Sequence, residues 1–368
     1  MNSGETELYS AWLSSIDGIG PARYDALLNR FGSAKAVWDC RDKETLTKLL
    51  GSKARDRLLE CSNDAYLDAL KERIDKAGVR VLCSDSDDYP VQLFRGVDAP
   101  PPVLYLKGET PLDSDCMFAI VGSRRCTRDG KRAAREFAEI LASQNVTVVS
   151  GLAYGIDAAA HEGALMGQGK TVAVLGCGAD VVYPQDNELL YRRILECGGT
   201  IVSEYPPGTQ PRAAYFPARN RIISGLSRGV LLVEGARRSG AMITIGCALE
   251  QGRDVFAVPG CIYSSLSEAP NRLLTEGATP ALSGWDILEH YHWAQRADAT
   301  QSRPVVKTEL SPLDERIVRP LLEQEMSLDE LGALLKDVST KEIIAHLTLL
   351  ELKNIVVPAP GGLYRAYL

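Results

Sequence analysis

The chain has 368 residues and a formal net charge of −7, with 45% hydrophobic and 24% charged residues. This length exceeds that of one ordinary domain, and the hydrophobic fraction can fill a core, so two or three folded domains are expected. An acidic pI near 5.4 excludes a protein that is basic throughout, so any site for a polyanion must be a local patch.

Cysteine spacing and hydropathy exclude further classes. The nine cysteines are an odd number and contain no CxxC pair, which argues against a zinc site and against a disulfide framework. The sequence contains no run of eighteen apolar residues and no charged-then-apolar leader, so neither a membrane span nor a signal peptide is expected. We therefore expect a cytoplasmic protein with reduced thiols and no metal.

The first part of the chain, residues 1–75, predicts a small domain of short helices. In "AWLSSIDGIGPARYDALLNRFGS" the turn Gly18-Ile19-Gly20 separates two apolar-periodic segments, which is the outline of a helix-hairpin-helix or SAM-like module. Glycines in such a hairpin let backbone N–H groups approach a DNA phosphate closely. A helical module that only packs against the rest of the protein explains the pattern equally well, and both interpretations stay open.

Residues 76–293 predict an extended α/β domain. Two strands, "VRVLC" and "VLYL", are followed by apolar β-branched runs that alternate with helical segments, beginning at "MFAIVGS" and ending at "DVFAVPG". Strands of this kind are typical of a mostly parallel sheet covered on both faces. The fold class predicted is a Rossmann-like, doubly wound α/β domain.

The end of the chain predicts a linker and a winged helix. Residues 294–309 are polar and without period, which favours a linker. Residues 310–368 predict three short helices and a terminal hairpin, and they carry 6 Lys and Arg against 9 Asp and Glu. Because a helix that reads duplex DNA should be basic, we expect this winged helix to serve protein interaction or duplex tuning.

Candidate binding residues lie in turns at one edge of the predicted sheet. In open α/β sheets ligands bind outside the carboxyl ends of the strands, and four turns expected there are rich in glycine and arginine. Glycine lets backbone amides face an anion, and guanidinium forks grip phosphate at two points. The turns thus predict a groove for several phosphates, with candidates Gly122, Ser123, Arg124, Arg125, Gly151, Phe216, Arg219, Asn220, Arg221, Arg237, Ser239 and Gly240.

Two features of these candidates are specific expectations. Arg219, Asn220 and Arg221 are placed in a turn ahead of a strand, just before the helical turn "IISGLS". Phe216 beside them could stack on a base or simply pack into the core, and the sequence leaves both open.

Other motifs predict no chemistry. "GKT" at 169–171 lacks the first glycine of a Walker loop, and "IVGSRR" lacks the GxGxxG of a dinucleotide site. Asp157 and His161 are four residues apart on one predicted helix, which could suggest acid–base work, but a solvated or capping pair is more common and no nucleophile accompanies them. No catalytic residue, cofactor or metal is expected.

Six segments together resemble a known family. "IVGSRR", "VVSGLAYGIDAAAH", "VYPQDN", "SEYPPG", "FPARNRIISGLS" and "SGAMITIGCALEQGRDVFAVPG" occur in order over about 150 residues, and this region resembles the DNA-processing protein A family (DprA, also called Smf). The resemblance implies a bacterial protein that forms homodimers, binds single-stranded DNA through the Rossmann-like domain, and loads the recombinase RecA during natural transformation. It also implies that the family's DNA-binding motifs correspond here to Gly122, Ser123 and Arg124, to Phe216 with Arg219, Asn220 and Arg221, and to Ser239 with Gly240.

Two rival functions remain at this stage. One is a Rossmann-type enzyme that hydrolyses nucleoside monophosphates, but the relevant loop, "EGARRSGAMIT", has arginines and no early acid. The other is an interaction scaffold without DNA contact, in which Arg219 and Arg221 are structural and paired with Glu204 or Glu234. Salt dependence separates these alternatives, because phosphate contacts release counterions and weaken steeply with salt.

Overall fold

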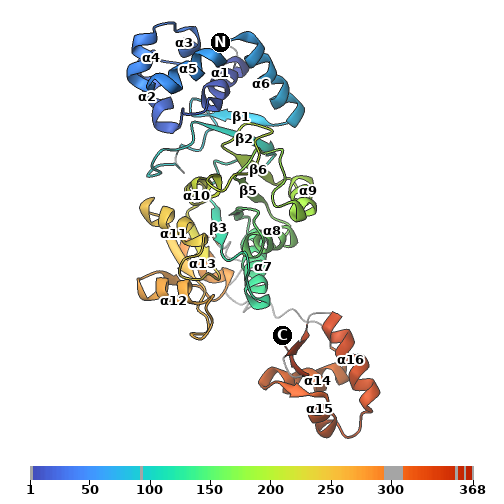
Figure 1. The fold of residues 1–368 in the computed structure, drawn as a ribbon. Helices are drawn as coiled ribbons and strands as arrows, with labels where there is room; N and C mark the ends of the chain where they lie inside the picture. The colour runs from blue at the N-terminus through green and yellow to red at the C-terminus, as the bar shows by residue number, and fades with distance from the viewer. Residues whose placement is uncertain (1–2, 92–93, 294–309, 353–354, 360–361, 367–368) are drawn as a thin grey trace. The chain divides into compact units, whose positions relative to one another are not determined.

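The protein is described from a computed structural model (Figure 1), which describes residues 3–91, 94–293, 310–352, 355–359 and 362–366. Its contacts divide the chain into two compact units, Met1–Gln295 and Arg296–Leu368. The predicted linker at 294–309 lies outside the described residues.

A single nine-stranded sheet forms the centre of the first unit, with strand order β1-β2-β6-β5-β4-β3-β7-β8-β9. The strands from β6 to β9 pair in parallel, whereas β2 pairs antiparallel with β6 and β1 antiparallel with β2. This confirms the predicted mostly parallel α/β fold. The strands are β1 (Arg80–Cys83), β2 (Val103–Gly108), β3 (Met117–Val121), β4 (Thr147–Ser150), β5 (Thr171–Leu175), β6 (Thr200–Ser203), β7 (Gly229–Leu232), β8 (Asp254–Ala257) and β9 (Thr279–Pro280).

The direction of winding changes between β3 and β7. From β3 the chain moves through β4 and β5 to β6 on one side, then crosses back to β7, which pairs with the other edge of β3 in parallel. The strand-end loops diverge at such a switch point and leave a crevice at the carboxyl edge. The loops after β3 and β7 therefore define where a ligand can enter.

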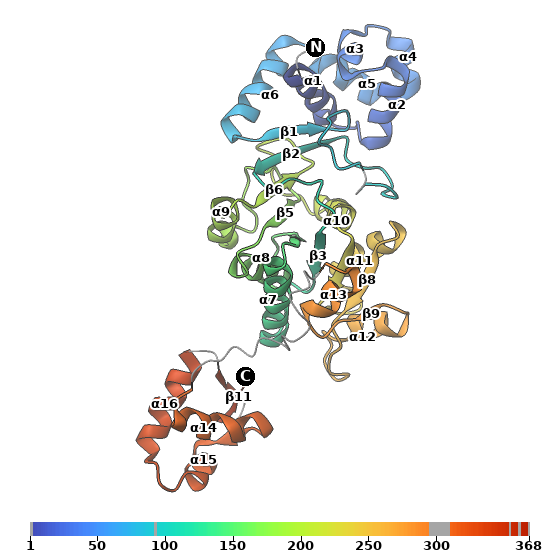
Figure 2. The same cartoon turned by 180° about the vertical axis from the view of Figure 1, so that it is seen from behind.

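Two helical layers cover the parallel strands, as Figure 1 and Figure 2 show from opposite sides. Alternate strand residues face each layer, so Phe118 and Ile120 pack on one side while Ala119 and Val121 pack on the other. The first layer holds α7 (Arg128–Ser143), α8 (Ile156–Met166), α9 (Glu188–Glu196) and α13 (Gly284–Tyr291). The second layer holds α10 (Tyr215–Gly225), α11 (Ala241–Glu250) and α12 (Glu268–Thr275).

Helix α10 corrects the sequence prediction that placed Arg219, Asn220 and Arg221 in a turn. The helix begins before Pro217, which is tolerated in a first turn because its missing N–H would have no intrahelical partner there. Its buried face contains Arg219 together with Ile222 and Ile223. A buried arginine interrupts the apolar periodicity by which a helix is recognised in a sequence.

The N-terminal segment is helical, as predicted, and shares a core with the sheet. Its helices are α1 (Ser3–Ser15), α2 (Pro21–Phe31), α3 (Ala34–Asp39), α4 (Lys43–Leu50), α5 (Ser52–Cys61) and α6 (Asp64–Ala77). Trp12 and Leu13 belong to one apolar cluster with Tyr105 of β2 and Leu175 of β5. Gly18, at φ 95°, makes the turn between α1 and α2. DNA contact by this hairpin stays a prediction.

The second unit contains the predicted three helices and terminal hairpin. Its elements are α14 (Pro312–Glu323), β10 (Met326–Ser327), α15 (Leu328–Leu334), α16 (Thr340–Leu352), β11 (Val356–Ala359) and β12 (Leu363–Ala366). The short strand β10, which was not predicted, joins the hairpin in a sheet of order β10-β12-β11. This is the element order of a winged helix, and that assignment stays a prediction.

The structure also describes the thiols and the hydropathy of the helices. All nine cysteines are free. Within the described ranges, no helix has the length and apolar character needed to cross a membrane.

Candidate nucleic-acid interface

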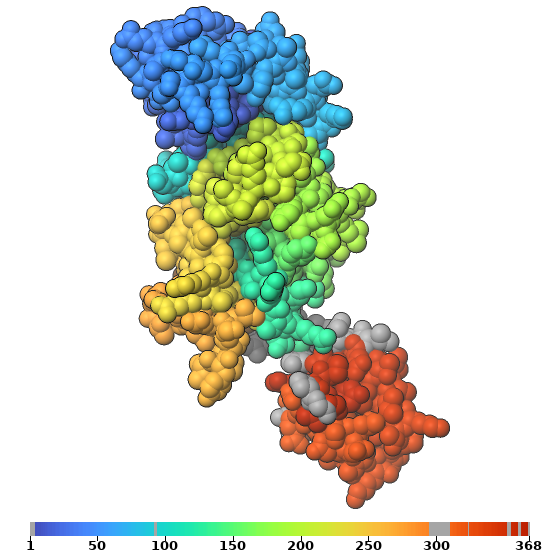
Figure 3. Space-filling model, in the orientation of Figure 1, coloured from blue at the N-terminus to red at the C-terminus, as the bar shows by residue number. Residues whose placement is uncertain are grey.

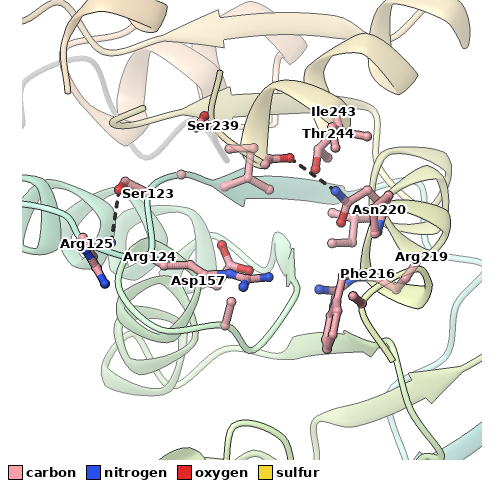
Figure 4. Close-up of a pocket in the computed structure, with 18 of the residues that line it drawn as sticks. Ser123, Arg124, Arg125, Asp157, Phe216, Arg219, Asn220, Ser239, Ile243 and Thr244 are labelled. Atoms are coloured by element: carbon pink, nitrogen blue, oxygen red, sulfur yellow. Dashed lines mark hydrogen bonds between the residues drawn. The ribbon is translucent and has the colours of Figure 1, made fainter. Parts of the chain in front are cut away.

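A pocket of about 660 Å³ lies at the switch point of the sheet. Its walls come from the loop after β3, the helix α10, the start of α11 and the segment between β4 and α8. Figure 3 shows the corresponding teal, yellow-green and yellow parts adjoining one another on the surface, and Figure 4 shows the side chains around the pocket. The pocket therefore occupies the edge at which the sequence predicted a ligand.

The loop after β3 presents two exposed arginines to this pocket. Arg124 and Arg125 both line it, and both are exposed. The backbone beneath them is fixed, because Ser123 N–H donates to Glu234 O at 2.8 Å and Arg125 N–H donates to Ser123 Oγ at 3.1 Å. A fixed loop with projecting guanidinium groups can bind an anion with little loss of backbone entropy.

Glu234 holds the same loop with its side chain. Its carboxylate accepts hydrogen bonds from Thr127 N–H at 2.8 Å and from Thr127 Oγ1 at 2.6 Å, at the residue that caps α7. The positive end of α7 is thus already paired with a carboxylate of the protein. Glu234 does not pair with Arg219 or Arg221, which was one of the structural alternatives.

Arg219 is buried rather than displayed. Its side chain is 3% exposed, and its Nη1 donates to Gly151 O at 2.8 Å and to Val174 O. Burial lowers the pKa of the Arg219 guanidinium to about 10, an effect that the nearby carboxylate of Asp157 opposes. The guanidinium forms part of the pocket floor and ties α10 to the ends of β4 and β5.

Arg221 lies on a different side of α10 and is absent from the described pocket lining. Its Nη2 donates to Glu204 Oε1 at 2.6 Å, in a pair whose side chains are only 18% and 16% exposed. Burial raises the pKa of Glu204, while Arg221 lowers it. The pairing of Arg221 with Glu204, which the sequence raised as a structural alternative, is therefore confirmed.

Asp157 and His161 are both buried, so of the solvated or capping pair that the sequence favoured, the solvated alternative was wrong. Burial raises the pKa of Asp157, and the positive charge of Arg219 opposes this rise. Thr171 donates its single hydroxyl hydrogen to Val148 O, so His161 must donate from Nδ1 to Thr171 Oγ1, at 2.7 Å. Burial lowers the pKa of His161 to about 3, which keeps this imidazole neutral at physiological pH.

The predicted glycines play two different roles. A Cβ on Gly151 would meet the Arg219 guanidinium and an Asp157 oxygen, each at 2.7 Å, so this glycine makes room for buried side chains. A Cβ on Gly240 would meet nothing within 4 Å. Only the second therefore leaves its backbone open to a ligand.

Phe216 both packs and faces the pocket. Its ring centroid lies 5.3 Å from that of Tyr183, and the guanidinium carbon of Arg124 lies 5.5 Å from its own centroid. Phe216 is half-buried and lines the pocket opposite the loop that carries Arg124 (Figure 4). The two roles that the sequence left open are thus combined in one side chain.

The remaining candidates divide between the pocket and the surface around it. Asn220 reaches the loop before α11 through a long hydrogen bond of 3.5 Å from Nδ2 to Gly240 O (Figure 4). Ser239 and Gly122 also line the pocket, whereas Arg237 is exposed and is absent from the described lining. Nine of the twelve candidates therefore line one pocket, whereas Gly151, Arg221 and Arg237 are absent from its described lining.

Sequence reasoning missed several residues of this site. Tyr183, Ile243 and Thr244 line the pocket, and Asp157 closes its floor. Tyr183 stands within the segment "VYPQDN", which signalled the family but no role for the tyrosine. An acid at the start of a helix that follows a glycine-rich strand end was the available signal for Asp157.

The lining of the pocket supplies groups that can bind an anion. Asp157 is the single carboxylate among the described lining residues, and it is buried beside Arg219. In the part of the chain that the structure describes, no three His, Cys, Asp or Glu side chains gather in a way that could hold a metal ion. Exposed arginines, an open glycine and a half-buried aromatic ring are the features that bind a single strand of nucleic acid.

Comparison with known proteins shows the family to which the chain is related. The sequence model of the family described as DNA recombination-mediator protein A matches residues 80–292. "Protein Smf" of Escherichia coli is 39% identical over 295 residues, covering 77% of each chain. "Protein Smf" of Synechocystis is 32% identical over 400 residues, covering 99% of this chain and all of the relative.

Solved structures agree with the sequence comparison. DNA processing protein A from Streptococcus pneumoniae has a TM-score of 0.66 and 35% identity, covering 77% of this chain and 97% of that one. DNA processing protein A from Helicobacter pylori, whose structure was described for its single-stranded DNA binding mode, has a TM-score of 0.51 and 28% identity, covering 59% of this chain and 97% of that one. The chain belongs to the DNA recombination-mediator protein A family.

Proposed function

We propose that this protein binds single-stranded DNA, with little sequence preference, in the pocket at the switch point of its sheet. The observation that carries the proposal is the pairing of Arg124, which is exposed on a fixed loop, with the ring of Phe216 at 5.5 Å. A cation beside an aromatic face suits a phosphate next to an unpaired base. The single-stranded DNA binding mode described for the Helicobacter pylori relative supports the same ligand.

Contacts to phosphate carry no sequence information directly, so binding should be general. The lining of the pocket fits this expectation. Asp157 is the single acid among its described residues and is buried, so no exposed acid of the lining orients the guanidinium groups of Arg124 and Arg125. Single strands are favoured over duplex because splayed bases can reach Phe216.

The test is binding of a labelled oligo-dT, followed by fluorescence anisotropy across a salt series. Wild type is compared with an Arg124→Ala/Arg125→Ala double variant. We expect weaker binding and a salt slope reduced by roughly 0.7 for each phosphate that the variant no longer neutralises. Equal binding by the two proteins would overturn the proposed site, and absence of binding by wild type would overturn the proposed ligand.

The matched control is Arg128→Ala. Arg128 is an exposed arginine at the start of α7, close in sequence to the loop but absent from the described pocket lining. It removes one positive charge from the same region, so its matched comparison is the single variant Arg124→Ala, which also removes one. The affinity of Arg128→Ala should stay near that of wild type, so a loss specific to Arg124→Ala reports the pocket rather than net charge.

We also propose that the bound strand is passed to RecA during natural transformation or homologous recombination, in the cytoplasm, by a homodimer. The family description as a recombination mediator supports this step. RecA filament assembly on oligonucleotides coated with single-strand-binding protein tests it. Wild type should accelerate assembly, and the Arg124→Ala/Arg125→Ala variant should not. Sedimentation tests the dimer, and a monomer at every concentration would contradict it.

The protein is proposed to act by binding and not as an enzyme. Incubation with nucleoside monophosphates should release no free base. Release of base that Asp157→Asn abolishes would instead support the nucleotide-processing alternative.

The second unit is proposed to serve protein interaction or duplex tuning, because its net charge is negative. Deleting residues 300–368 should leave affinity for oligo-dT largely intact, and a large loss of affinity would refute this role.

A further inference from the structure

The pocket continues past Arg124 into a second, smaller hollow. Five of the eight residues that line this hollow also line the main pocket, among them Arg124 and Phe216. The residues that belong to the hollow alone include Tyr154 and Pro184. The two spaces are therefore one continuous surface, and its outer part is aromatic.

Two tyrosines that line this hollow are exposed. Tyr183 is 42% exposed and Tyr154 is 44% exposed. Tyr183 lies beside Phe216 with an interplanar angle of 36°, and Tyr154 donates from its hydroxyl to Asp186 Oδ2 at 2.8 Å. Both rings are thus held in place while retaining area that water contacts, a combination typical of contact surfaces.

The charges around the hollow favour different chemical groups at its two ends. Arg124 lines both the hollow and the main pocket, whereas Asp186 is exposed beside Tyr154. A phosphate is attracted to the first end and repelled from the second. A neutral, planar group is therefore the favoured occupant next to the tyrosines.

The size of the hollow selects how such a group would lie. Its volume of about 40 Å³ is a small fraction of the 660 Å³ of the main pocket. A nucleobase cannot be enclosed there. It can lie across the exposed tyrosine rings, in the way that bases stack on aromatic platforms of proteins that bind single strands.

We propose that Tyr183 and Tyr154 form a stacking platform for an unpaired base of the DNA strand, adjacent to the phosphate held by Arg124. This inference rests on the proposed function and extends its site beyond the residues that the sequence suggested. It assigns the phosphates to the arginine side of the surface and the bases to the tyrosine side.

The experiment measures affinity for two labelled oligonucleotides of equal length, oligo-dT and an oligomer of abasic residues with the same phosphate spacing. Tyr183→Ala should bind oligo-dT about five- to a hundred-fold more weakly than wild type, the range for removal of one stacked base. On the abasic oligomer the two proteins should bind alike. The salt slope should not change, because every phosphate contact is retained.

Matched variants test whether the aromatic ring of Tyr183 is responsible for the affinity. Tyr183→Phe keeps the ring and should bind like wild type, whereas Tyr183→Leu keeps apolar contact with Phe216 but offers no aromatic face, and should bind like Tyr183→Ala. Tyr154→Ala should show the same dependence on bases. If Tyr183→Ala melts early by circular dichroism, Tyr183→Leu and Tyr154→Ala replace it.

Two results overturn the platform: wild-type affinity of Tyr183→Ala for oligo-dT, or an equal loss of affinity on both oligonucleotides, which would make the residue structural. Failure of the proposed function looks different. In that case wild type does not bind oligo-dT, or Arg124→Ala/Arg125→Ala binds it as well as wild type does.

Discussion

The arginines of α10 and those of the loop after β3 belong to similar sequence patterns, yet the fold uses them in opposite ways. Arg219 and Arg221 direct their N–H groups to backbone carbonyls and to Glu204. Arg124 and Arg125 project from a loop whose backbone is tied to Glu234, and they remain exposed. The number of arginines in a segment therefore does not measure the positive charge that a ligand meets.

This difference also changes how the site should be tested. A double variant of Arg219 and Arg221 would remove internal contacts and could unfold the helix that carries Phe216. Loss of DNA binding by such a variant would not identify a DNA contact. The exposed pair of the loop gives the cleaner experiment.

The largest effect expected is on the stability of the buried region. Arg219→Met should lower the free energy of unfolding by about 3–5 kcal/mol, because it removes buried hydrogen bonds to two backbone carbonyls and leaves Asp157 without its neighbouring positive charge. Denaturant titration measures this decrease. A change below about 1 kcal/mol would show that Arg219 does not hold the helix, and Arg128→Met is the exposed control.

The second-largest decrease in the free energy of unfolding is expected at the pair of Arg221 and Glu204. Arg221→Met is expected to destabilise by about 2–4 kcal/mol, since it strands a mostly buried carboxylate. The double variant Arg221→Met/Glu204→Leu should recover at least part of that stability, because no uncompensated charge remains. Urea denaturation measures the free energy of unfolding of each variant. If the effects of the two substitutions on it simply add, the pair is not coupled, and Arg221 does not belong with the structural arginines.

Low pH should lower the free energy of unfolding, because His161 is buried in its neutral form. Its folded pKa of about 3 lies below the ordinary value of 6.5, so below about pH 6.5 the unfolded state binds a proton that the folded state does not. The stabilisation is present above pH 6.5 and is lost as pH falls toward 3, by roughly 2–3 kcal/mol between pH 6.5 and 4.5.

The variant His161→Gln removes this titrating group, so the stability gap between wild type and variant should narrow as pH falls through that window. The exposed His292 supplies the control variant, His292→Asn, which removes a histidine outside the buried region. A constant gap for His161→Gln would show that the imidazole is protonated equally in both states. Denaturant titrations at pH 7.0, 5.5 and 4.5 measure both variants.

The smallest effect should be on the stability of the loop variant. Arg124→Ala is expected to change the free energy of unfolding by less than about 0.5 kcal/mol, because the side chain is exposed, while its affinity for single-stranded DNA falls. Thermal melts and anisotropy on the same preparation make the comparison. A destabilisation similar to that of Arg219→Met would erase the distinction between the two regions.

Much of this organisation could be predicted from the sequence. The apolar runs at 117–121, 147–150 and 171–175 are strands of the sheet as expected, because β-branched residues buried on both faces leave a local signal. The edge at which the pocket lies was predicted as well, since parallel strands bring their carboxyl ends together. The helix α10 was not, because Arg219 occupies a position on its buried face.

The sequence by itself determined the alternation of strands and helices, the acidic balance of the chain and the turns at which a ligand could bind. Only the tertiary structure decided which arginines are available, since Arg219 is buried by Gly151 and Val174, which lie 68 and 45 residues away in the chain. It also brought Tyr183 beside Phe216. Contacts between distant segments leave no local pattern, and burial decides whether a charged side chain meets solvent or the protein.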